Sequence, residues 1–471
     1  MSGTGVTTRF APSPTGDIHI GNARTALFSA LLARRHGGRF LLRIEDTDRE
    51  RSRAEHVGAL IEDLRWLGLR WDAGPGCGPK GADTVYFQSN RGALYQRYFE
   101  DLAAREFAYP CFCTPADLER ERTRQRGDAQ APRYSGRCRG LTAGERRERL
   151  EREPAALRFA VAGTGTLGFD DLVRGPQTFR VADIGDFVIR RSDGTPAFFF
   201  SNAIDDALMN VTHVLRGEDH LANTPRQIMI LRALGLPVPH YGHLGLVVDE
   251  HGAPLSKRRG DVSLRALRAR GYLADAVVNY LARLGRSGID EGLRDLDDLA
   301  RGFEEHALAR GPARFDERQL HHWQRQALQK IDAAGLWGWL DEETRARVPA
   351  DQREAFLRMV RGNMSDPVAA RQLAHILFSD VFDMAEDAQR AIDTAAERFF
   401  CRAVDAVDQC GTDFACLRRV LMDSTGLRGH ALFAPLRAAV TGGIEGPEMA
   451  QLLPMMGAQR VRERLLRRCH G

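Results

Sequence analysis

Lysine is scarce in this chain. Of its 67 basic residues only Lys80, Lys257 and Lys330 are lysine, and the other 64 are arginine. The ammonium group of lysine is a compact point charge on a flexible stem, and a planar guanidinium does not replace it at every site. Each lysine is therefore a candidate for a position that arginine cannot serve.

Long apolar runs are also missing. No stretch reaches the roughly 18 apolar residues that a membrane span needs. The first ten residues, MSGTGVTTRF, contain no charged segment followed by an apolar one, which a secretory leader would have. We therefore expect a cytoplasmic protein with no membrane partner. The net charge of +4 permits a polyanionic partner without requiring one.

The cysteines do not form the pattern of a secreted disulfide scaffold. The 8 cysteines are scattered over 471 residues, so reduced thiols are expected. Three of them share a short stretch with a tyrosine, in the order Cys111, Cys113, Tyr134 and Cys138. Three thiolates could bind a tetrahedral structural zinc ion, with Tyr134 or water as the fourth ligand; the alternative is three unligated thiols. The other five, which have no metal-like spacing, are predicted to be ordinary thiols: Cys77, Cys401, Cys410, Cys416 and Cys469.

The length exceeds what one hydrophobic core organises, so two to four domains are expected. The segments TTRFAP, SPTGDIHIG, NARTALFSALLARR and RFLLRIED predict strand, loop, helix and strand, a βαβ unit that binds ligands at the carboxyl ends of parallel strands. The segment THVLRGED and a helix from about Thr224 continue this pattern. We predict an α/β fold: a Rossmann-type parallel-sheet domain in two halves, 1–91 and 181–259, an inserted domain at 92–180, a linking region at 260–325 and an all-helical domain at 326–471.

Two loops carry residues suited to phosphate chemistry. APSPTGDIHIGN lies between a strand and a helix, where backbone N–H groups favour an anion; His19 can donate to phosphate, Gly21 leaves room for a nucleobase, and Asn22 is expected to cap the helix. In APLSKRRGD, a mobile loop with Lys257 could place an ammonium on phosphates. Taken singly, each loop could instead be an ordinary turn or surface tripeptide.

A dinucleotide fingerprint is rejected. Gly163, Gly165 and Gly168 match GxGxxG, but the following FDDLVRG is no amphipathic helix. The match is predicted to be a turn between strands, which argues against an oxidoreductase.

The two phosphate loops together resemble the signature pair of class I aminoacyl-tRNA synthetases. The longer strings TRFAPSPTGDIHIGNARTA, LLRIEDTDRERS, VTHVLRGEDHLANTPRQ and PLSKRRGDVSL are similar to bacterial-type glutamyl-tRNA synthetases in particular. The similarity extends over nearly all of the chain, is weaker between about 326 and 430, and recovers at FAPLRAAVTG.

The resemblance implies a glutamate-tRNA ligase. In this family ATP, with Mg²⁺, activates L-glutamate to glutamyl-adenylate, and the glutamyl group passes to the 3′-terminal adenosine of tRNA-Glu. The parallel-sheet domain would be catalytic, the inserted domain would bind the acceptor stem and hold the zinc, the linking region would contact the tRNA stem, and the helical domain would bind the anticodon. A monomer is the family's usual form.

The resemblance also assigns residues. For ATP it implies His19, Gly21, Asn22, Ser256, Lys257 and Arg258, with His19 and Lys257 catalytic; for glutamate it implies Arg9, Ser13, Glu45, Phe198, Asn202 and Arg216. The chemistry agrees, because Arg9 or Arg216 can grip a carboxylate and Glu45 can hold an ammonium. Viewed singly, each could instead belong to a structural ion pair.

The chain departs from the family pattern at three positions. Pro254 stands where the motif has a second lysine, Phe198 where a tyrosine often frames the amino acid, and Asn22 where the general motif has a second histidine. The first two departures affect the rate and the details of glutamate recognition.

Two other functions remain open at this point. One is a paralogue that glutamylates tRNA-Gln as well as, or instead of, tRNA-Glu; the other is a catalytically silent tRNA-binding protein. The intact His19, Glu45, Arg216 and Lys257 argue against the silent protein. The long helical C-terminal part disfavours shortened relatives that glutamylate queuosine, and also glutaminyl enzymes, which resemble a β-barrel type there.

Overall fold

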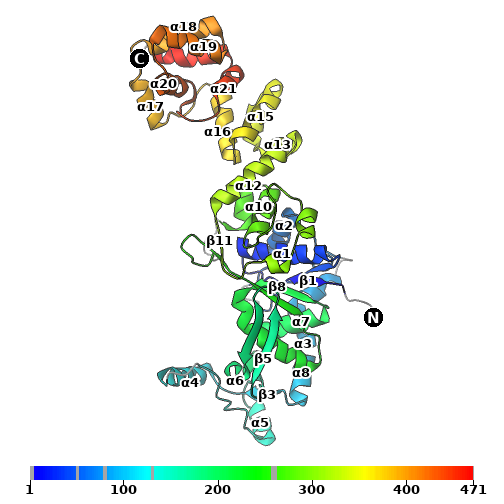
Figure 1. Cartoon of the computed structure of the whole chain (residues 1–471). Coiled ribbons are helices and arrows are strands. Elements are labelled where there is room, and N and C mark those ends of the chain that lie inside the picture. Colours follow the sequence, from blue (N-terminus) through cyan, green and yellow to red (C-terminus); the bar gives the residue numbers. More distant parts are fainter. Residues whose placement is uncertain (1–4, 49–51, 78–81, 129–131, 256–261, 470–471) are drawn as a thin grey trace. The chain divides into compact units, whose positions relative to one another are not determined.

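The computed structural model describes residues 5–48, 52–77, 82–128, 132–255 and 262–469 (Figure 1). The chain divides into two compact units. The first comprises Met1–Arg268 and Val277–Gln319, and the second comprises Ala269–Ala276 and Leu320–Gly471. Among the described residues, no helix combines the length and the apolar character that crossing a membrane requires.

The first unit is organised around parallel strands. Strand β1 (Thr7–Phe10), helix α1 (Ile20–Arg35) and strand β2 (Arg39–Leu42) form the predicted βαβ unit, with β1 and β2 parallel. Strands β8 (His213–Gly217) and β9 (His240–Leu244) form a second parallel pair. β8 lies against β1, where the N–H of Thr212 donates to the carbonyl of Thr7 over 2.9 Å. The apolar side chains of α1 that follow helical spacing are buried, including Ala26, Leu27 and Leu31.

The strands between the two parallel pairs are antiparallel. Strands β3 (Ala108–Cys111), β4 (Ala156–Phe159) and β7 (Phe187–Arg190) form one sheet, and β5 (Thr166–Asp171) with β6 (Gly175–Arg180) form a hairpin. Of the rejected glycine fingerprint, Gly163 and Gly165 lie in the connection between β4 and β5, in line with the predicted turn between strands, and Gly168 lies within β5. The end of this hairpin reaches the parallel sheet, because the N–H of Leu172 donates to the carbonyl of Tyr241 in β9 over 2.8 Å.

The remaining elements of the first unit are mainly helical. They are α2 (Ala54–Trp66), η1 (Ala82–Tyr86), η2 (Gln88–Asn90), α3 (Gly92–Ala104), α4 (Pro115–Gly127), α5 (Ala143–Leu150), α6 (Val181–Ile184), α7 (Phe198–Leu208), η3 (Glu218–Asn223), α8 (Thr224–Leu234), β10 (Val247–Val248), α9 (Leu264–Ala269), α10 (Ala274–Arg283), α11 (Leu296–Arg301), η5 (Glu305–Ala307) and β11 (Ala313–Arg314). Ala269, the last residue of α9, and residues 274–276 in the first turn of α10 belong to the second unit.

From Leu320 on, the described residues of the second unit form helices joined by loops, with no strand. Its helices are α12 (Glu317–Lys330), α13 (Ala333–Trp339), α14 (Glu342–Arg347), η6 (Ala350–Gln352), α15 (Arg353–Asn363), α16 (Pro367–Phe378), α17 (Glu386–Asp393), α18 (Phe399–Cys410), α19 (Phe414–Thr425), α20 (His430–Thr441), α21 (Met449–Met456) and α22 (Ala458–Cys469). Their apolar faces share one core, which includes Phe356, Leu373 and Phe399. The predicted α/β fold followed by a helical domain is therefore confirmed.

The prediction of ordinary thiols is wrong for four cysteines of the second unit. Cys401 pairs with Cys469, and Cys410 pairs with Cys416, as disulfides. The first pair joins α18 to α22, which pack side by side although the cysteines are 68 residues apart. The second pair spans the turn between α18 and α19. Sequence spacing alone does not reveal that these helices are neighbours.

Candidate active site

A cavity of about 470 Å³ lies where the parallel strands of the first unit end. It gathers every predicted ATP or glutamate residue that the structure describes: Arg9, Ser13, His19, Gly21, Asn22, Glu45, Phe198, Asn202 and Arg216. Ser256, Lys257 and Arg258 lie outside the described residues. The first unit therefore brings together side chains from distant parts of the chain at one site.

His19 caps the first helix at one edge of the cavity. Its backbone is extended, and its Nδ1 accepts hydrogen bonds from the backbone N–H groups of Gly21 (3.1 Å) and Asn22 (3.4 Å). The prediction that Asn22 caps the helix is wrong, because Asn22 already lies in the first turn. A histidine is an uncommon cap, so residue preference pointed to the asparagine. Because Nδ1 accepts, the proton of the neutral ring lies on Nε2, which is a donor.

Gly21 packs closely against the ring of His19. A Cβ built on Gly21 would lie 3.0 Å from Cε1 and 3.1 Å from Nδ1 of His19. A side chain at this position would push the ring away from its cap. The contact with His19 is therefore a second reason for a glycine at position 21, in addition to the space for a nucleobase that the sequence predicted.

Arg216 is a buried cation in the cavity wall. Its side chain donates to three neutral acceptors: Nε to His243 Nε2 (3.1 Å), and Nη2 to Thr224 Oγ1 (2.8 Å) and Gln227 Oε1 (2.7 Å). Burial lowers the pKa of Arg216 to about 10, so the group stays charged at neutral pH. Its Nη1 is buried and has no hydrogen-bond partner among the described residues.

Glu45 and Arg9 are held by a buried ionic cluster. Arg43, whose side chain is fully buried, contacts Glu45 Oε1 through Nη2 (3.0 Å) and Asp206 Oδ1 through Nη1 (2.7 Å). Arg9 Nε donates to the same Asp206 oxygen over 3.2 Å. Burial raises the pKa of Glu45, and the positive charge of Arg43 together with a hydrogen bond from Asn202 opposes that rise. The cluster therefore fixes the position of Glu45, whose pKa stays above its usual value because burial outweighs the opposing contacts.

Amide side chains connect this cluster to Arg216. Asn202 Nδ2 donates to Glu45 Oε1 (2.6 Å), and Gln227 Nε2 donates to Asn202 Oδ1 (2.8 Å). Since Gln227 also accepts from Arg216, one hydrogen-bonded path crosses the cavity wall. Sequence reasoning missed Arg43, Asp206 and Gln227. A charged residue inside the apolar run LLRIED was the available signal for Arg43.

Two family departures also line the cavity. Phe198 begins α7, and its ring centroid lies 5.1 Å from that of His220. Pro254 forms an isolated β-bridge with Val248 and also lines the cavity. Both positions thus lie beside the predicted substrate residues, where a tyrosine hydroxyl and a second lysine would otherwise stand.

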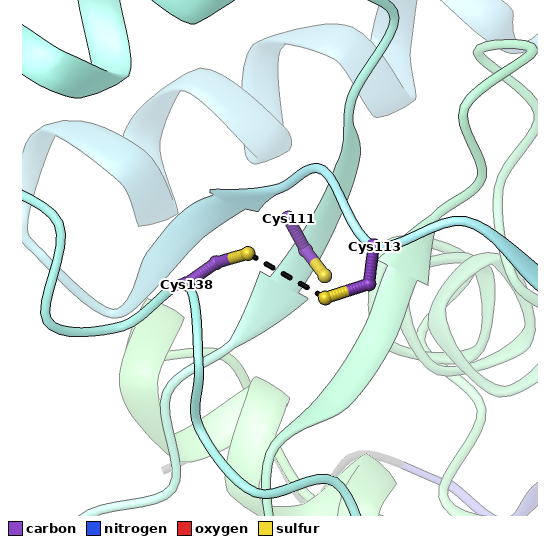
Figure 2. A group of neighbouring side chains, drawn as sticks. All are labelled: Cys111, Cys113 and Cys138. Carbon is purple, nitrogen blue, oxygen red and sulfur yellow. Dashed lines mark hydrogen bonds between the residues drawn. The ribbon is translucent and has the colours of Figure 1, made fainter. Parts of the chain in front are cut away.

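The three cysteines singled out from the sequence lie together at the end of β3. Figure 2 shows Cys111 and Cys113 close together, with Cys138 facing them from another loop. Their Sγ atoms all lie within 4.8 Å of one another. The hydroxyl of Tyr134 is 3.5 Å from the Sγ of Cys111 and 3.7 Å from that of Cys113.

The spacing of the sulfur atoms in this cluster suits a metal. Burial raises the pKa of the Cys111 thiol, but hydrogen bonds from Arg158 and Tyr134 outweigh it, and the net pKa is lowered. The Sγ atoms of Cys113 and Cys138 are 3.7 Å apart. That separation matches the edge, about 3.8 Å, of a tetrahedron with Zn–S bonds of about 2.3 Å.

Family models match both parts of the chain. The model described as tRNA synthetases class I (E and Q), catalytic domain, matches residues 5–322. The chain belongs to this family. The model described as an anticodon binding domain matches residues 339–469 of this class I synthetase. The resemblance drawn from the two phosphate loops is confirmed. Class I synthetases in general use ATP with Mg²⁺.

Close relatives align over almost the whole length. The synthetase is 55% identical over 466 residues to "Glutamate--tRNA ligase 2" of Nitrosococcus oceani, covering 99% of this chain and 98% of the relative. It is 52% identical over 463 residues to "Glutamate--tRNA ligase 1" of Methylococcus capsulatus, covering 98% of each. It is also similar to the crystal structure of a glutamate tRNA ligase from Elizabethkingia meningosepticum in complex with its amino acid, with a TM-score of 0.85, 27% identity and 99% of each chain covered.

Proposed function

We propose that this synthetase is a glutamate-tRNA ligase, which forms glutamyl-adenylate from L-glutamate and ATP and transfers the glutamyl group to the 3′-terminal adenosine of tRNA-Glu. The observation that carries the proposal is Arg216, a buried cation in the cavity wall with an unpaired Nη1 and no ion pair among the described residues. A buried charge of this kind is stabilised by an anionic partner. A glutamate carboxylate supplies that partner, and the names of the close relatives agree.

The same cavity provides for the other charges of the amino acid. The carboxylate of Glu45 lines the cavity and can accept the ammonium group, while the buried Arg9 can assist a second carboxylate. Asn202 donates a hydrogen bond to Glu45 and orients its carboxylate. A substrate with two carboxylates and one ammonium group therefore matches the charges of the wall.

The edge formed by α1 suits the phosphates of ATP. The N-terminus of α1 favours an anion, and the Nε2 of His19 is oriented as a donor by the cap that its Nδ1 makes. We assign Lys257, with Ser256 and Arg258, to phosphate contacts as well, on the strength of the sequence motif. When bound, Mg²⁺ would add positive charge to the phosphates of ATP. The attack itself needs no side-chain nucleophile, because positioning and charge stabilisation suffice.

The remaining parts of the chain receive roles consistent with this reaction. We assign residues 92–180 to the acceptor stem, 260–325 to the tRNA stem and 326–471 to the anticodon, the last supported by the anticodon-domain match. We propose that the synthetase is monomeric and works in the cytoplasm, where its tRNA substrate is found.

Aminoacylation with labelled glutamate tests the function. Purified tRNA-Glu and tRNA-Gln transcripts are compared in parallel, with Lys257→Ala as the control for phosphate chemistry. We expect charging of tRNA-Glu, and a loss of at least about a hundredfold in kcat/KM in the variant, because one charge-assisted contact to the reacting phosphates disappears. Charging of tRNA-Gln would redirect the proposal to the paralogue, and no charging of either would contradict it.

We further propose that Cys111, Cys113 and Cys138 bind a structural zinc ion, with Tyr134 or water as the fourth ligand. Protein purified from zinc-supplemented cells should contain about one zinc per chain by mass spectrometry of the metal. Cys138→Ser should lose it, because a neutral hydroxyl replaces a thiolate. Cys77→Ser is the matched control, since Cys77 lies outside the cluster. Equal zinc content in both variants would disprove the site.

A further inference from the structure

Two buried residues that the proposed reaction does not use lie directly behind Arg216. His243 belongs to β9, and Asp171 ends β5 in the antiparallel hairpin; both are buried. His243 Nε2 accepts from Arg216 Nε over 3.1 Å, and His243 Nδ1 lies 2.5 Å from Asp171 Oδ2. A path of three side chains therefore runs from the hairpin to the cavity wall.

The carboxylate of Asp171 has a fixed orientation. Its Oδ1 accepts from the backbone N–H groups of Val173 (3.0 Å), Arg174 (2.9 Å) and His243 (3.1 Å). With one oxygen held by three donors, the other is directed at the imidazole. Hydrogen bonds from His243 and from the backbone lower the pKa of Asp171 in spite of its burial, so the group is ionised.

This arrangement determines the tautomer of His243. A carboxylate only accepts hydrogen bonds, so Nδ1 must carry the proton, and Nε2 is left as an acceptor for Arg216. Burial lowers the pKa of His243, which keeps the ring neutral. The ring centroids of Phe169 and Tyr241 lie 6.5 and 6.3 Å from that of the imidazole.

We propose that Asp171 and His243 are positioning residues for glutamate recognition: Asp171 holds His243 in the tautomer that accepts from Arg216, and so aims the unpaired Nη1 at the amino acid. The guanidinium is planar, so fixing Nε by His243 and Nη2 by Thr224 and Gln227 also fixes the direction of Nη1. The inference rests on the proposed function, because glutamate is its ligand.

Asp171→Asn tests the tautomer with almost no change of shape. The amide oxygen must stay with the three backbone donors, so the NH₂ group faces His243 Nδ1. The ring proton then moves to Nε2, which can donate to Thr224 Oγ1 at 3.0 Å but can no longer accept from Arg216. We expect the KM for glutamate and its calorimetric Kd to rise about tenfold or more, with the KM for ATP within about twofold of the wild type. An unchanged glutamate KM, or equal rises for glutamate and ATP, would overturn the proposal.

His243 variants keep the test valid even if Asp171→Asn folds poorly. The amide oxygen of His243→Gln can accept from Arg216 without any tautomer, whereas His243→Leu cannot accept. Glutamate binding should therefore weaken much more in the leucine variant. Adding Asp171→Asn to His243→Gln should cause no further loss, and additive losses would show that Asp171 acts by another route. Calorimetry reads glutamate binding directly, so a wild type that binds glutamate but charges no tRNA would refute the proposed function alone.

Discussion

Replacing Arg216 with glutamine should lower kcat/KM for glutamate by about a thousandfold, on the order of 4 kcal/mol. The estimate takes two charge-assisted hydrogen bonds to a desolvated carboxylate at about 2 kcal/mol each. Glutamine keeps a polar side chain but leaves the substrate carboxylate without a cation. Aminoacylation measured against glutamate at saturating ATP would show the loss. An unchanged kcat/KM would remove Arg216 from the amino-acid site.

The thermal stability of Arg216→Gln should be equal to or higher than that of the wild type. Arg216 has no ion pair among the described residues, so its hydrogen bonds to neutral groups and its contact with the Tyr241 ring offset the cost of burying its charge only in part. The unfolding temperature of Arg216→Gln should therefore match or exceed that of the wild type.

For the kcat/KM prediction, Arg226→Gln is the matched control, because Arg226 lies next to Gln227 on α8 but does not line the cavity. Its kcat/KM should stay within about threefold of the wild type.

Local patterns in the sequence were enough to predict the scaffold. The apolar spacing of α1 and the short apolar runs on either side of it determine a βαβ unit, because each signal lies within a few residues. The rejection of the glycine fingerprint rested equally on neighbouring residues. Where the deciding contacts are local, sequence reasoning and the structure agree.

Contacts between distant segments explain what the sequence could not supply. Arg43 meets Asp206, a residue 163 positions away, and His243 meets Asp171 across two different sheets. The same limit hid the Cys401 to Cys469 disulfide. The candidate residues were recognised from family motifs one by one, but the network that orients them depends on folding and left only a faint signal, such as an arginine within an apolar run.

Arg43 offers the largest expected effect on stability. Its side chain has no exposed surface, and it contacts Glu45, Asp206 and, at 3.9 Å, Asp205. Although burial opposes the charge, these carboxylates hold the pKa of Arg43 above its usual value. Arg43→Met should lower the free energy of unfolding by about 3 to 5 kcal/mol, because it leaves buried carboxylates without their shared cation.

Chemical denaturation of the variants would measure this loss. Arg34→Met is the matched control: its ion pair with Asp297 is about half exposed, so a change below about 1 kcal/mol is expected. Adding Asp206→Asn to Arg43→Met should restore part of the stability, because it removes one of the stranded charges. A loss in Arg43→Met no larger than in the control would mean that the buried carboxylates are neutralised by protonation. In that case Glu45 could no longer hold the ammonium of glutamate, and the variant should lose glutamate binding while remaining folded.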